Sequence, residues 1–250
     1  MPPWWAVLGD ERWAISAGST GEWLTLSAEQ IGQAADHIAK DGIYLLYAPL
    51  APHTARELYN ELKALDWNLT KWIDDKFWLA DQDQLSRIGE ERIQAFAQGQ
   101  AEDQFRLCYD VMEVNSPLAP RKTSGDMLDA LYAAWIAAAA MMVWNAILLG
   151  ETVVSLRMQA SRFRPAHFLT PHDDGGVESR VTAFVLSLEP DWQPHWGGQL
   201  HIDDNAGKTQ VITPSHNTLT LFTVPRDYFV SQVASYAPRG RIAVSGCLMR

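Results

Sequence analysis

The sequence is poor in cysteine and in positive charge, and each shortage excludes a class of protein. Cys108 and Cys247 are the only cysteines, too few for the disulfide framework of a small secreted domain. We therefore expect a reducing, cytoplasmic location. Lys and Arg number 20 against 30 Asp and Glu, so the formal net charge is −10. Because an acidic chain repels phosphate backbones, we expect no nucleic-acid partner.

Long uncharged runs are also rare, with one exception at residues 130–150. The N-terminal segment has no basic stretch followed by an apolar one, so we expect no secretory signal there. Residues 130–150 carry no charged side chain and are long enough to span a bilayer. However, the run is rich in alanine, contains Asn145, and is bounded by Asp129 and Glu151 rather than by basic residues. We expect a buried helix here and no membrane span.

Apolar residues are plentiful, at 47% of the chain, and they include 11 Trp among the 250 residues. This is enough for a large core in one compact domain. Core packing explains tryptophans at this frequency, and the lining of an aromatic pocket is the alternative.

Residues 1–150 are expected to form a mainly helical support layer with a few strands. Ser27 and Gln30 fit a capping box, which predicts a helix over residues 27–40. Leucines at spacings of four and three predict an amphipathic helix over residues 53–65. Further helices are expected over residues 82–98 and 126–149, and strands over residues 43–47 and 105–111.

Residues 151–250 have a different pattern, in which short β-rich runs alternate with turn residues such as Gly197-Gly198. Closely spaced short strands of this kind predict a sandwich or barrel. Helices followed by strands predict an α+β chain, mainly β, in which a helical layer packs on a β core. The expected strands cover residues 153–164, 180–188, 198–203, 209–213, 218–224, 228–233 and 241–249.

One local pattern in this half suggests a metal site. His172 and Asp174 are two residues apart, and on an extended strand residues i and i+2 point to the same side. A third ligand from a distant strand would complete a triad of two histidines and one carboxylate, which leaves positions on iron open. A His-x-Asp pair alone is a weak signal, since most such pairs are ordinary polar loop residues.

Several blocks around this pair give it a context. Residues 162–169 lead into His172, and the later blocks are residues 180–188, Asp191-Trp192, and residues 197–200, 214–222, 230–233 and 239–246. In this order and spacing, residues 155–250 resemble the prolyl-hydroxylase-like branch of the iron(II)- and 2-oxoglutarate-dependent oxygenases.

The resemblance implies a fold and a set of site residues. The fold would be a double-stranded β-helix, or jelly roll, with iron(II) in its open mouth. His172 and Asp174 match two metal ligands, and Arg241 matches the basic residue that pairs with the distal carboxylate of 2-oxoglutarate. A guanidinium suits that role because it forms a bidentate pair with a carboxylate. Ser245, four residues further on the same strand face, would add a hydroxyl contact.

The third ligand position departs from the family pattern, because Tyr228 stands where relatives have a second histidine. A phenol, with an ordinary pKa of about 10, must lose its proton to bind a metal well. Phe163 and Ser187 replace tyrosines that often contact 2-oxoglutarate, and Ala166 replaces a usual glycine. The alternative histidine ligands are His167, His195, His201 and His216.

Three functions are compatible with these residues. The first is an iron(II)/2-oxoglutarate-dependent dioxygenase that uses O2 to hydroxylate a prolyl residue or an amino-acid-type substrate, small or peptidyl. The second is a non-catalytic or metal-impaired relative that serves as a binding module on the same fold, as Tyr228 suggests. The third is a cupin-like metal enzyme that needs neither 2-oxoglutarate nor Arg241. The sequence carries no marker of the substrate.

Overall fold

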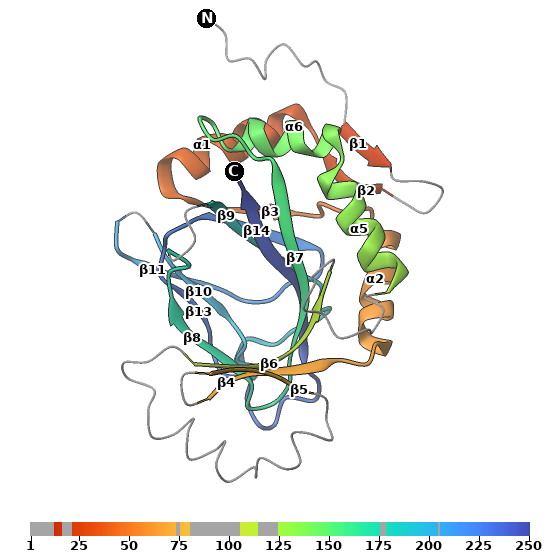
Figure 1. The fold of residues 1–250 in the computed structure, drawn as a ribbon, viewed down its shortest axis with the longest axis vertical. Helices are drawn as coiled ribbons and strands as arrows, with labels where there is room; N and C mark the ends of the chain where they lie inside the picture. The colour runs from red at the N-terminus through yellow and green to blue at the C-terminus, as the bar shows by residue number, and fades with distance from the viewer. Residues whose placement is uncertain are drawn as a thin grey trace, which may run out of the picture.

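The structure is a computed structural model that describes residues 13–16, 22–73, 76–80, 106–114, 125–175, 179–204 and 206–250. Its main feature is a curled, 12-stranded antiparallel sheet with helices along one side (Figure 1). The curled sheet confirms the predicted double-stranded β-helix. In spatial order its main path is β11 (Thr209–Ile212), β10 (Leu200–Asp203), β13 (Tyr228–Val230), β8 (Phe168–His172), β6 (Leu107–Glu113), β7 (Ser155–Phe163), β14 (Arg241–Met249), β9 (Arg180–Ser187), β12 (Thr218–Thr223) and β3 (Ile43–Tyr47).

Strands from the first half of the chain complete this sheet. β6 pairs with both β7 and β8, so it joins the two sides of the curl. β4 (Asn68–Ile73) pairs with β6 and with β5 (Lys76–Ala80), while β1 (Trp13–Ser16) and β2 (Glu22–Leu26) form a separate pair.

Local sequence signals explain the first two helices. In α1 (Ala28–Asp41), the Gln30 amide donates to Ser27 Oγ at 3.2 Å, and the Ser27 amide donates to Gln30 Oε1 at 2.9 Å. This confirms the predicted capping box. The helix ends at Gly42, whose φ of 72° is the left-handed conformation that glycine adopts without strain. α2 (Pro52–Ala64) begins with a proline, which has no amide hydrogen to leave unpaired. The helix predicted over residues 82–98 lies outside the described residues.

The single helix predicted over residues 126–149 is wrong. The chain forms α5 (Asp126–Ile136) and α6 (Ala138–Ile147), bent by 65° at Ala137, which has an extended ψ of 149°. The break frees the Trp135 carbonyl, and Trp144 Nε1 donates to it at 3.2 Å. Within the described residues no single helix is long and apolar enough to cross a membrane, and this bent pair meets that criterion only when its two helices are taken together.

The strands at the centre of the sheet are buried on both faces, which explains their nearly continuous apolar sequences. On β9, Phe184 and Leu186 pack toward the helices, whereas Ala183 and Val185 face the inside of the curl. On β14, the same alternation directs the side chains of Ile242, Val244 and Leu248 into the helical core and those of Ala243 and Cys247 into the inner one. The sheet therefore separates two apolar cores.

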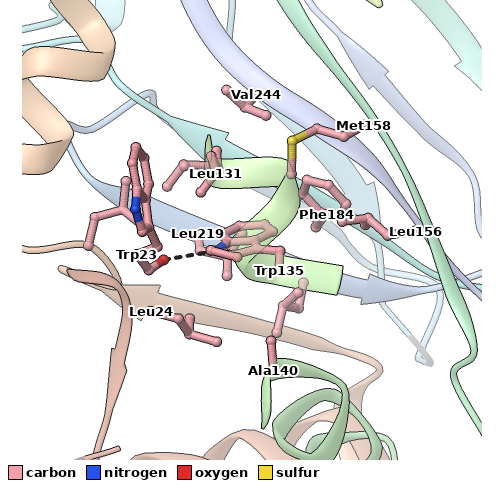
Figure 2. Close-up of a cluster of buried hydrophobic side chains, with 14 of the residues drawn as sticks. Trp23, Leu24, Leu131, Trp135, Ala140, Leu156, Met158, Phe184, Leu219 and Val244 are labelled. Atoms are coloured by element: carbon pink, nitrogen blue, oxygen red, sulfur yellow. Dashed lines mark hydrogen bonds between the residues drawn. The ribbon is translucent and has the colours of Figure 1, made fainter. Parts of the chain in front are cut away.

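Trp135 lies at the centre of the core between helices and sheet (Figure 2). Its indole is fully buried, donates to the Trp23 carbonyl at 2.8 Å, and makes edge contacts with the rings of Trp144 and Phe184. Core packing thus accounts for these tryptophans, as predicted.

Candidate active site

The inside of the curl contains a cavity of about 660 Å³ lined by strands from both of its sides. His172, Asp174, Tyr228, Arg241 and Ser245 all line this cavity. The structure thus brings together the five residues that the sequence singled out, although they span most of the second half of the chain.

His172 is the last residue of β8, and its ring is held by the backbone. Nδ1 lies 3.1 Å from the Thr170 carbonyl, which can only accept, so Nδ1 carries the proton and Nε2 the lone pair. Burial lowers the pKa of His172, which favours the neutral imidazole that metals bind.

The extended backbone assumed for the His-x-Asp pair is wrong. β8 ends at His172, and Asp174 has a φ of 58°, in the left-handed region. Aspartate tolerates this region better than most residues do. The two side chains therefore reach the same cavity through a turn rather than through the alternation of a strand.

Both carboxylate oxygens of Asp174 have protein partners. Tyr228 Oη donates to Oδ2 at 2.8 Å, and the Arg180 guanidinium forms an ion pair with Oδ1. Burial and the Asp174 charge raise the pKa of Tyr228 well above its ordinary value, so the phenol keeps its proton. Tyr228 is also the cross-strand partner of His172, with ring centroids 4.1 Å apart.

The conventional ligands here number two rather than three. Among the described residues, no group of three or more His, Cys, Asp or Glu side chains could hold a metal ion. The Tyr228 hydroxyl, which donates a hydrogen bond to Asp174, is the oxygen beside this pair that could serve as a third ligand.

Arg241 lies deep in the cavity wall at the start of β14 and is only 2% exposed. Its guanidinium sits over the Phe163 ring at 5.3 Å, and its Nε has no hydrogen-bond partner among the described residues. Burial lowers the pKa of Arg241 to about 10, which still leaves it cationic at neutral pH. A buried cation with an unused donor is suited to an anionic ligand.

None of the four alternative histidines lines the cavity. His195 stacks on Tyr236, and His201 stacks on Phe229. His216 Nδ1 lies 2.7 Å from the Leu188 carbonyl, and His167 is buried.

Sequence reasoning missed several polar residues of the cavity, among them Tyr109, Arg180 and Cys247. Tyr109 stacks on Phe163, with ring centroids 4.9 Å apart, and so brings a phenol close to one position where the family tyrosine is missing. Cys247 Sγ lies 4.0 Å from Asp174 Oδ2, and burial raises the pKa of this thiol to about 12. Tyr109 could not be assigned because the pairing of β6 joins residues far apart in sequence.

Comparison with known proteins agrees with this fold. The sequence model of the 2OG-Fe(II) oxygenase superfamily matches residues 158–249, while no curated protein matches the chain significantly. A prolyl-4-hydroxylase of Pseudomonas putida has a similar fold, with TM-score 0.59 and 19% identity over 88% of this chain and 98% of that one.

Two further solved structures share the fold. A 2OG-Fe(II) oxygenase family oxidoreductase of Burkholderia pseudomallei gives TM-score 0.60 and 13% identity over 88% of this chain and 90% of that one. The other is a prolyl hydroxylase of Trichoplax adhaerens in complex with a peptide fragment of the hypoxia inducible factor oxygen degradation domain. It gives TM-score 0.61 and 14% identity over 88% of this chain and 89% of that one.

Proposed function

Because residues 158–249 match the sequence model of the 2OG-Fe(II) oxygenase superfamily, we propose that the chain is an iron(II)/2-oxoglutarate-dependent dioxygenase that hydroxylates a prolyl residue or an amino-acid-type substrate. The third metal-ligand position of this enzyme is atypical, because it is Tyr228. The observation that carries the proposal is the buried, incompletely satisfied guanidinium of Arg241 in the same cavity as His172 and Asp174.

Arg241 fits the co-substrate on chemical grounds. A buried charge without a full set of partners destabilises a fold, and a carboxylate of 2-oxoglutarate would supply the missing charge and the missing acceptor. Ser245 lines the same cavity four residues along β14 and offers a hydroxyl. A site without 2-oxoglutarate, as in a cupin-like enzyme, would give this buried arginine no ligand to bind.

The metal would be held by His172 Nε2 and Asp174, with the Tyr228 oxygen beside them. Iron(II), when bound with 2-oxoglutarate and O2, supplies the oxidising chemistry, whereas the protein supplies binding and orientation. The Thr170 carbonyl fixes the ring of His172, and apolar side chains such as Leu200 and Phe222 form part of the cavity wall. Metal binding to Asp174 would compete with the ion pair from Arg180.

Turnover tests the proposal directly. Purified protein with iron(II), 2-oxoglutarate and O2 is expected to form succinate and CO2, and Asp174→Ala is expected to abolish this activity because it removes the only carboxylate ligand. Succinate is measured by chromatography and bound iron by a colorimetric assay. If protein shown to be loaded with iron forms no succinate, the proposal is contradicted.

A second function is favoured by one specific contact, the hydrogen bond from Tyr228 to Asp174. A protonated phenol is a poor metal ligand, and it also occupies a carboxylate oxygen that the metal needs. The chain would then be a non-catalytic or metal-impaired relative that acts as a binding module on this fold.

Tyr228→His distinguishes these two functions. If the chain is a metal-impaired binding module, this variant is expected to bind ferrous iron at least about tenfold more tightly, because a neutral imidazole supplies a lone pair at neutral pH. Equilibrium dialysis without oxygen measures the affinity, and Tyr236→His, at an exposed tyrosine outside the cavity, is the matched control. A lower affinity in Tyr228→His identifies Tyr228 as a native ligand and eliminates the binding-module alternative.

A further inference from the structure

We propose that Glu113 binds a cationic nitrogen of the substrate, so that the substrate of this cavity is an amine. The inference deepens the proposed function and rests on it, because it takes the cavity around His172 and Asp174 as the substrate site.

Glu113 is the last residue of β6 and lines this cavity. Its Oε2 is buried and has no hydrogen-bond partner in the described part of the chain. A carboxylate oxygen withdrawn from water without a partner is costly, and native structures seldom retain one without a reason. A ligand that brings a donor, and preferably a positive charge, would remove that cost.

The neighbouring side chains do not supply this donor. Gln159 faces Glu113 across the β6–β7 pair, but its Nε2 donates to Tyr109 Oη at 3.3 Å. Arg157 lies two residues along β7 and also lines the cavity, yet it leaves Glu113 Oε2 without a partner. The described side chains therefore leave this acceptor unmet, and the cavity that Glu113 lines is where a ligand could supply the donor.

Glu113 is also in the part of the cavity where the reaction would take place. Gln159 pairs with Glu113 on one side and with Ser245 on the other, so the three residues form a row across three strands. Burial raises the pKa of Tyr109, and the charges of Asp174 and Glu113 raise it further, so both carboxylates are near enough to act on the same phenol. A small amine held at Glu113 would thus lie in the same enclosed space as the His172 and Asp174 pair.

Arg241 and Glu113 lie at different levels of the cavity wall, because Arg241 pairs with Phe163 on β7 whereas Glu113 pairs with Gln159, four residues away. Arg241 selects an anion, the carboxylate of 2-oxoglutarate, whereas Glu113 selects a cation. This separation would keep co-substrate and substrate from exchanging places, because each would meet a like charge at the wrong end.

Calorimetric titration tests the proposal with L-proline, L-lysine and 1,5-diaminopentane, each compared with its N-acetylated analogue. We expect at least one amine to bind and its acetylated analogue to bind more weakly. Glu113→Gln is expected to lower the affinity for that amine about tenfold to a hundredfold, and to lower the affinity for the acetylated analogue much less. Glu57→Gln, at an exposed glutamate of α2 outside the cavity, is expected to leave both affinities unchanged.

Three results would overturn the proposal: no binding of any amine, equal binding of amine and acetylated analogue, or unchanged amine affinity in Glu113→Gln. Thermal unfolding of Glu113→Gln checks that the variant folds, and we expect no loss of stability because the substitution removes an unpaired charge. Titration needs no turnover, so the two proposals can fail separately. Amine binding without succinate formation contradicts only the proposed function, whereas succinate formation without amine preference contradicts only this inference.

Discussion

Arg241→Met is expected to abolish binding of 2-oxoglutarate and to leave the ligand-free protein at least as stable as the wild type. The two effects have one cause, which is the burial of the guanidinium at 2% exposure with an unpartnered Nε. The ligand loses its charged partner, and a fall in affinity of at least about a hundredfold follows, or about 2.7 kcal/mol.

The gain in stability comes from the removal of a poorly compensated charge. Replacing a buried ion by an apolar side chain of similar volume is often neutral or stabilising, by up to about 4 kcal/mol. The nearest acid, Glu189, would not be stranded, because Glu189 accepts from Arg239 at 3.1 Å and from the Ile242 amide at 2.7 Å.

Thermal unfolding with and without 2-oxoglutarate measures both effects in one experiment. The wild type should gain Tm with the ligand, since a ligand that binds only the native state stabilises it, and Arg241→Met should not. Arg250→Met, at an arginine whose side chain is 55% exposed, is the control and should respond like the wild type. A lower Tm of Arg241→Met together with an intact response to 2-oxoglutarate would mean that Arg241 is only a structural residue.

Trp135→Ala is expected to lower the free energy of unfolding by about 3–5 kcal/mol, the range for the loss of a large buried aromatic side chain. The substitution removes the ring contacts with Trp144 and Phe184 and leaves the Trp23 carbonyl without its donor. Urea unfolding measures the change. Because these contacts join the helices to the sheet, the helical layer is expected to detach from the strands.

Two companion variants test the reason for this loss. Trp135→Phe keeps an aromatic ring but loses the indole donor, so it should cost about 1–3 kcal/mol. Met142→Ala, on α6 at 61% exposure, should change stability by no more than about 0.5 kcal/mol. If Trp135→Ala is no more destabilising than Met142→Ala, the packing around Trp135 does not hold the two layers together.

Local patterns in the sequence predicted the parts of the structure that depend on local chemistry. The capping box at Ser27 and Gln30 formed as expected, because it involves only neighbouring residues. The alternation in β6 was visible, but its partners were not, because β6 pairs with β7 across some fifty residues, as in Asp110 with Arg162. Tyr109 and Glu113 could therefore not be assigned to the cavity.

The remaining errors come from single side chains that override a local pattern. Neither glycine nor proline marks the bend at Ala137, and the carbonyl that the bend frees is satisfied by Trp144. Arg180 is part of a plausible strand, and only the turn at Asp174 brings the two into an ion pair. The ordered blocks of the second half located His172, Asp174 and Arg241, because a fold family constrains order and spacing more than individual contacts.

The alternation along β14 separates the positions where substitutions affect the core from those where they affect ligand binding. Even-numbered positions such as Ile242, Val244 and Leu248 face the helices, whereas Arg241 and Ser245, at odd-numbered positions, face the cavity. Substitutions at the first set would act mainly on folding, whereas substitutions at the second would act mainly on ligand binding. A single strand thus lets new ligand preferences evolve without a change in the core on its other face.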